Sequence, residues 1–153
     1  MALILTVLAV TRPVDPKRLR LVPGSETGTA LAVMVVGMLT LGQALDSLTM
    51  LVGLGQHGSM PVIRRALASA AGPELFAAVV VIGLMAGAAE EIFFRGYIQT
   101  ALRARWRAPV AVLVTSGAFG LLHLEWLHAV LAFLVGLYLG FLTEVSGSAL
   151  PAI

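Results

Sequence analysis

The sequence contains no cysteine. Disulfide bonds, thiol nucleophiles and thiolate-metal sites are therefore excluded, and with them cysteine proteases and zinc fingers. Two further hydrolase patterns are missing, because neither Gly-x-Ser-x-Gly nor His-Glu-x-x-His occurs anywhere in the chain. Any hydrolytic chemistry must therefore come from other residues.

Charge is also scarce. Charged residues make up 12% of the 153 positions, whereas hydrophobic residues make up 59%. This composition is typical of an integral membrane protein. The ten Lys and Arg residues form short clusters between apolar runs and no continuous patch, so we expect no nucleic-acid partner and a lipid bilayer as the environment.

The apolar runs predict an all-α, polytopic transmembrane helix bundle with about four to five membrane helices. The first run, at 1–10, has about half the length that a spanning helix requires, so we interpret it as part of a helix. Residues 1–28 are expected to form this partial membrane helix and a basic cytoplasmic loop, and residues 29–153 a helical core. The remaining runs that predict membrane helices are 29–55, 74–103, 109–123 and 127–142.

The basic residues predict the orientation. Arg64 and Arg65 lie between the first two complete spans, and seven basic residues lie in the loops on the opposite side. The side with more Lys and Arg is expected to be cytoplasmic. The seven residues are Arg12, Lys17, Arg18, Arg20, Arg103, Arg105 and Arg107.

Two carboxylates and a guanidinium interrupt the apolar run at 74–103. Glu91 and Arg95 are four residues apart, which places them on one face of a helix, whereas Glu90 is turned by about 100° from Glu91. Ionisable residues inside a membrane helix are costly and usually functional. One carboxylate can thus be held by the arginine while the other stays free to react.

An imidazole is expected at the same depth. Glu90 and Glu91 lie roughly 18–20 Å along their helix from Arg103, and His123 lies roughly 21 Å along the next helix from its start. A carboxylate and an imidazole away from bulk water can together activate a water molecule, which suits hydrolysis of an amide. Phe119 lies four residues before His123 on the same face and packs either over the site or simply between helices.

Other interpretations of these residues stay open. Glu91 and Arg95 could serve helix packing alone, and the carboxylate pair could be the proton site of a small transporter. A divalent metal held by Glu90, Glu91 and His123 is the alternative to a site without a cofactor, although two carboxylates and one histidine suit several metals only weakly.

The two motifs resemble those of a known family. Glu90-Glu91-x-x-x-Arg95, followed by Phe119-x-x-x-His123 on the next helix, is similar to the first two motifs of the CPBP family, also called the Abi or type II CAAX endopeptidase family. It includes CAAX prenyl proteases and bacteriocin-processing enzymes. The resemblance runs from Glu74 to the end and includes the Gly-Ser-x-x-Pro-Ala-Ile sequence at 147–153.

The resemblance implies an intramembrane endopeptidase in which Glu90 is the general base and His123 assists it. Glu91 and Arg95 would be the supporting pair, Phe119 would contact the substrate, and no metal would be required. The substrate would be a peptide or protein, with or without a lipid group, and the location a bacterial cytoplasmic membrane. A non-catalytic member that binds a partner or confers bacteriocin immunity is the alternative.

The sequence departs from the family at its end. The family's last motif, His-x-x-x-Asn, follows shortly after Pro-Ala-Ile, and it does not occur within the 153 residues. We therefore expect a piece of a longer protein that lacks the last core helix, or a degenerate member. The 153 residues alone are expected to lack an oxyanion donor. Loss of such a donor lowers the reaction rate by a factor on the order of 10²–10³.

Overall fold

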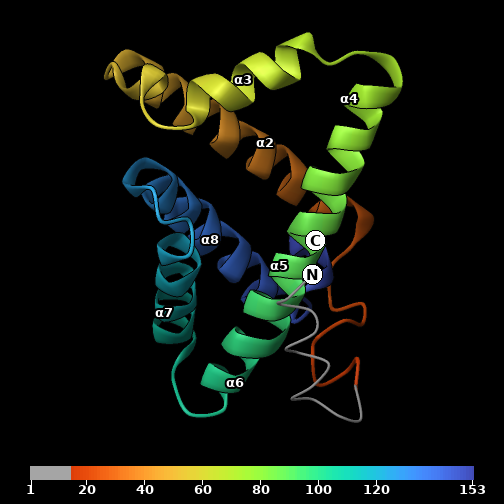
Figure 1. The fold of residues 1–153 in the computed structure, drawn as a ribbon. Helices are drawn as coiled ribbons and strands as arrows, with labels where there is room; N and C mark the ends of the chain where they lie inside the picture. Colours follow the sequence, from red (N-terminus) through yellow and green to blue (C-terminus); the bar gives the residue numbers. More distant parts are fainter. Residues whose placement is uncertain (1–14) are drawn as a thin grey trace.

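The computed structural model describes residues 15–153, which are built from helices (Figure 1). No strand occurs within these residues. Within residues 15–153, three helices are long and apolar enough to cross a membrane, and a shorter apolar helix lies between the second and third. The prediction of an all-α polytopic bundle is thus confirmed. The partial helix predicted at 1–10 lies outside the described residues.

The first spanning helix, α2 (Gly28–Leu51), begins where Thr27 caps it. The Thr27 side chain accepts a hydrogen bond from the backbone N–H of Ala30, a group that has no partner inside the helix. The short helices η1 (Leu54–Gln56) and α3 (Met60–Ser69) follow. They occupy the region between the first two predicted spans, which contains Arg64 and Arg65.

The second spanning helix runs without interruption over Gly72–Arg103, close to the predicted 74–103. Two of its stretches have wide turns with i→i+5 hydrogen bonds, a geometry that is rare in helices and frequent at functional sites. The carboxylates lie between these two stretches. Its segments are α4 (Gly72–Ala78), η2 (Val79–Ala86), α5 (Gly87–Glu91), η3 (Ile92–Gln99) and α6 (Thr100–Arg103).

The last two long helices form an antiparallel hairpin. Helix α7 (Ala108–Leu121) has 14 residues and is about 21 Å long, shorter than a bilayer core of about 30 Å. Helix α8 (Trp126–Ser146) has 21 residues and ends at Gly147, whose φ of 74° lies in the left-handed region that glycine adopts without strain. The chain then forms the short helix η4 (Leu150–Ala152).

The buried side chains gather where α5, η3, α7 and α8 meet, and many are polar. The outer faces of the long helices expose valine, leucine and methionine, as expected for surfaces that contact lipid. Helix α2 is joined to α8 by the Tyr138 hydroxyl, which donates to the carbonyl of Met34 at 2.8 Å. The largest fully buried side chains are Arg95, Phe94, Gln99, Thr115, Thr143, Ser116 and Ser148.

Candidate active site

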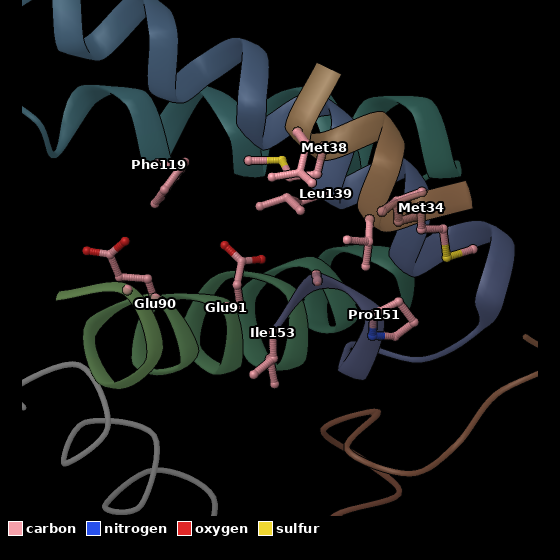
Figure 2. A pocket seen from close by; sticks show the side chains of 14 residues that line it. Met34, Met38, Glu90, Glu91, Phe119, Leu139, Pro151 and Ile153 are labelled. Carbon is pink, nitrogen blue, oxygen red and sulfur yellow. The ribbon is translucent and has the colours of Figure 1, made fainter. Parts of the chain in front are cut away.

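The two adjacent carboxylates lie at the end of α5 and have different surroundings. Glu91 is buried, with 4% of its surface exposed, whereas Glu90 is half-buried. Figure 2 shows the Glu90 carboxylate pointing toward Phe119 and the Glu91 carboxylate pointing toward Leu139, both from the same helix into one space. This arrangement agrees with the different directions that helix geometry predicts for neighbouring residues.

Arg95 is fully buried and contacts three groups. One guanidinium nitrogen donates to Oε1 of Glu91 at 2.9 Å, and another donates to the carbonyl of Gly136 in α8 at 3.1 Å. The guanidinium carbon lies 4.8 Å from the centre of the Phe119 ring, within the range of a cation–π contact. The predicted pair of Glu91 and Arg95 is therefore present, and it joins η3 to both α7 and α8.

The ion pair leaves some of its polar atoms without a protein partner. Oε2 of Glu91 and Nε of Arg95 are buried and have no hydrogen-bond partner within residues 15–153. Burying a charged group is costly unless its lone pairs and N–H groups are satisfied. Such an arrangement is poor for stability alone, which favours a functional interpretation of the pair.

Phe119 lies in the last turn of α7, and His123 follows two residues after the helix ends. Phe119 is buried, with its ring edge-on to the rings of Phe94 and His123 at centroid distances of 5.0 and 5.1 Å. His123 is half-buried and follows the last residue of α7, Leu121, instead of lying within the helix as predicted. Helical geometry ends there because the chain turns into the loop before α8, where Leu124 adopts a φ of 56°.

The hydrogen bond of His123 identifies its tautomer. Nδ1 of the ring lies 3.0 Å from the carbonyl oxygen of Phe119. A carbonyl oxygen can only accept, so Nδ1 carries the hydrogen and donates. In the neutral ring Nε2 is then the nitrogen with a free lone pair, which is the atom that can accept a proton.

A cavity of about 380 Å³ lies in front of the carboxylates. Glu90, Glu91 and Phe119 all line it, so the structure brings these three predicted site residues together around one space (Figure 2). Arg95 lies behind Glu91, and His123 lies beside Phe119 without lining the cavity. The remaining lining residues are Met34, Val35, Met38, Leu39, Gly83, Gly87, Leu139, Leu142, Pro151, Ala152 and Ile153.

Among residues 15–153, the His, Asp and Glu side chains do not cluster as metal ligands. No group of three or more His, Asp or Glu side chains in residues 15–153 is close enough to hold a metal ion together. Glu90, Glu91 and His123 therefore do not make the three-ligand site that the sequence left open as an alternative. No step of the chemistry proposed below passes through a metal.

The chain matches a model of a known protein family. A model described as type II CAAX prenyl endopeptidase Rce1-like matches residues 72–153, which is more than half of the chain. The chain belongs to this family. The match begins at the first residue of α4 and includes both motifs, so the family predicted from them is confirmed. No curated protein and no solved structure matches the chain.

Membership in the Rce1-like family decides the class of the protein. These proteins are intramembrane endopeptidases of the CAAX-protease type, which act on peptide or protein substrates in a lipid environment. The three long apolar helices agree with this environment. The chain is therefore an integral membrane protein of a peptide-hydrolase family.

The fold of this Rce1-like chain uses a buried polar residue that sequence reasoning missed. Gln99 is fully buried and donates from Nε2 to the carbonyl of Gly140 and to Oε1 of Glu144, both at 3.0 Å. The signal was present in the sequence, because Arg95 and Gln99 are four residues apart and so are their partners Gly136 and Gly140. Neither Gly136 nor Gly140 has a side chain, which lets α8 approach α7 and the helix of the carboxylates closely.

Proposed function

We propose that the chain is an intramembrane endopeptidase in which Glu90, assisted by His123, activates a water molecule that attacks a peptide carbonyl. The observation that carries this proposal is the pair of carboxylates that face one cavity. Glu91 is engaged by Arg95, whereas Glu90 has no ion pair within residues 15–153. A general base needs a free lone pair, and Glu90 meets this requirement better than Glu91.

The reaction balances with these groups alone. Glu90 accepts a proton from water while the water oxygen bonds to the carbonyl carbon, which leaves a tetrahedral intermediate with a negative oxygen. The carbon–nitrogen bond then breaks, and the proton passes to the departing amine. His123 assists through Nε2, the nitrogen left free by the hydrogen bond from Nδ1 to Phe119. A positioned base of this kind typically contributes a rate factor of about 10²–10⁴.

Glu91 and Arg95 act as a supporting pair in this proposal. The 2.9 Å ion pair keeps the Glu91 carboxylate in place one residue from the base, and the bond from Arg95 to Gly136 fixes the pair against α8. A charge that is held rigidly in a low-dielectric site contributes to the electrostatics of the reaction without reorganisation. Phe119 covers the pair and forms part of the cavity wall.

The cavity suggests a substrate class. Its volume of about 380 Å³ falls within the range of small-molecule sites, about 300–1,000 Å³, and most of its wall is apolar. Met34, Met38 and Leu139 would contact an apolar side chain next to the cleaved bond. We propose a peptide or protein substrate, with or without a lipid group, that is cleaved near the cytoplasmic side of a bacterial cytoplasmic membrane.

The experiment is proteolysis of a quenched peptide library by the full-length protein in liposomes, because the 153 residues alone are expected to lack an oxyanion donor. Glu90→Gln and His123→Ala are compared with Glu74→Gln and His57→Ala, which change the same residue types at exposed positions away from the cavity. We expect Glu90→Gln to lower the rate by about 10²-fold or more. The two control variants should cleave at the wild-type rate.

Three outcomes would contradict the proposal. If Glu90→Gln cleaves as fast as the wild type, Glu90 is not the base, and if a chelator abolishes cleavage, the metal alternative replaces the proposed mechanism. A folded wild type that cleaves no peptide would favour the non-catalytic, partner-binding alternative. Circular dichroism of each variant establishes that the helices are intact.

A further inference from the structure

The segment before α2 folds across one end of the bundle. Residues 15–25, here called the strap, begin with a turn in which the N–H groups of Leu19 and Leu21 donate to the carbonyls of Asp15 and Pro16. Arg20 in this turn has a φ of 54°, a left-handed conformation that is unfavourable for a residue with a side chain. Strained residues of this kind persist only where surrounding contacts hold them.

One side of the strap contacts the helix that carries the carboxylates. Leu19 is buried, with 3% of its surface exposed, and its carbonyl oxygen approaches Gly96 of η3. A Cβ atom at position 96 would lie 2.9 Å from that oxygen, so the contact requires glycine there. Gly96 directly follows Arg95.

The other side of the strap contacts the chain after α8. The carbonyl of Arg20 accepts hydrogen bonds from the N–H of Ala149 at 2.8 Å and from the hydroxyl of Ser148 at 3.4 Å. The N–H of Ser25 donates to the carbonyl of Ser146 at 2.9 Å. The unusual backbone of Arg20 thus points its carbonyl at the segment that leads into η4.

The side chain of Arg20 adds an ion pair to these bonds. It lies 2.9 Å from Glu144 of α8, and the same carboxylate also contacts Arg103 at the end of α6 at 2.7 Å. Gln99 donates to this carboxylate as well. The strap, the helix of the carboxylates and α8 are therefore joined at Glu144.

The segment held by Arg20 forms one wall of the cavity. Pro151, Ala152 and Ile153 line the same space as Glu91, and Figure 2 shows Pro151 and Ile153 on the side of the cavity near Glu91. Leu19 and Arg20 are consecutive residues, and between them they contact both the helix of the carboxylates and the segment that forms this wall.

We propose that Arg20 is a positioning residue: the strap sets the distance between the carboxylate helix and the wall formed by 151–153, and so determines how the substrate fits beside Glu91. The effect on cleavage rests on the proposed function. The effect on the position of the wall does not depend on the proposed function, because it follows from the contacts of Leu19 and Arg20 alone.

The test of the wall uses thiol labelling. The chain has no cysteine, so Ala152→Cys introduces a single thiol into the cavity wall. In this background Arg20→Met, which removes the ion pair to Glu144 that holds the strap against α8, should raise the labelling rate about fivefold or more. Arg18→Met removes the same charge from an exposed position of the strap and should leave the rate unchanged, and Arg20→Lys, which keeps the charge, should remain closer to wild type.

A second variant disturbs the strap from the opposite side. Gly96→Ala should displace Leu19 and raise the labelling rate of the thiol at position 152 in the same way. Alanine favours a helix more than glycine does, so a weakened η3 could not explain this result. Equal labelling rates in wild type, Arg20→Met and Gly96→Ala would overturn the proposal.

Cleavage kinetics complete the test. If the chain is a peptidase, Arg20→Met should raise KM about fivefold or more with a smaller change in kcat, because the wall is displaced while the base is not. A fall in kcat with an unchanged KM would contradict a role in positioning the substrate. If no variant cleaves any peptide, the proposed function fails, whereas the labelling experiment still decides the role of the strap.

Discussion

The contact between Glu91 and Arg95 supports a quantitative prediction. Arg95→Met keeps an unbranched apolar side chain and removes the guanidinium, which leaves the buried Glu91 carboxylate without a partner. The variant loses a 2.9 Å ion pair, a 3.1 Å hydrogen bond to Gly136 and a cation–π contact at 4.8 Å. Leaving one buried charge unpaired costs about 3–5 kcal/mol, and the other two contacts add about 1–3 kcal/mol.

A double-mutant cycle measures the interaction energy between Glu91 and Arg95 apart from the contacts that each makes with other residues. Glu91→Leu alone leaves the guanidinium unpaired, so it too should be strongly destabilising, whereas the double variant Glu91→Leu with Arg95→Met contains no buried charge at either position. Replacing a buried ion pair by apolar residues is often neutral. We therefore expect the double variant to be more stable than either single variant, with a coupling energy of about 3 kcal/mol or more.

The assay is reversible unfolding of the protein in detergent micelles, followed by circular dichroism. The matched control is the pair Asp46 and Arg64, which is also an ion pair but is far more exposed to solvent than Glu91 and Arg95. Its cycle should give a coupling energy of about 0–1 kcal/mol. If the cycle of Glu91 and Arg95 gives a value as small as the control, the guanidinium is not held by the carboxylate, and the division of labour between Glu90 and Glu91 would be refuted.

Three further predictions follow from other contacts. Gly140→Leu should destabilise the fold by about 1–3 kcal/mol through overpacking, measured by the same unfolding assay, because Val112 and Gln99 leave no room for a side chain. Tyr138→Phe should cost about 1 kcal/mol in that assay by removing the bond to Met34. The bonds from Ser59 to Glu125, on the loop before α8, hold the pKa of this carboxyl below its usual range. The ionised Glu125 carboxylate therefore stabilises the folded state above the usual carboxyl pKa, and this contribution is lost as pH falls through the lowered pKa. The melting temperature should accordingly change less with pH in Glu125→Gln than in wild type.

Several elements of the site could be predicted because they depend on local spacing. A separation of four residues on a helix brings Glu91 to Arg95 whatever the rest of the fold, and the same rule separates Glu90 from this pair. Phe119 could be placed next to His123 for the same reason. The spacing of the small residues Gly136 and Gly140 is typical of a close helix contact, although it does not identify η3 and α7 as the partners.

Other elements could not be predicted because they depend on long-range packing. The end of α7 before His123 is one such case, since the apolar run continues to that residue and the helix stops where the chain must turn toward α8. The contacts of Gln99 and Glu144 are another, because a glutamine near the end of an apolar run is equally compatible with a position at the membrane interface.

The sequence by itself determined the membrane environment, the helical class, the family and the carboxylate that is paired with Arg95. The first two depend on composition, and the family depends on short motifs and their order along the chain. The paired carboxylate depends on a separation of four residues, where helix geometry decides which side chains meet. Only the tertiary structure decided which surfaces close the cavity, because its wall combines α2, α5, α7, α8 and the segment at 151–153. It also decided that Arg20, 124 residues before Glu144, reaches this carboxylate. Contacts across such separations arise when whole helices pack, and no local pattern in the sequence specifies them.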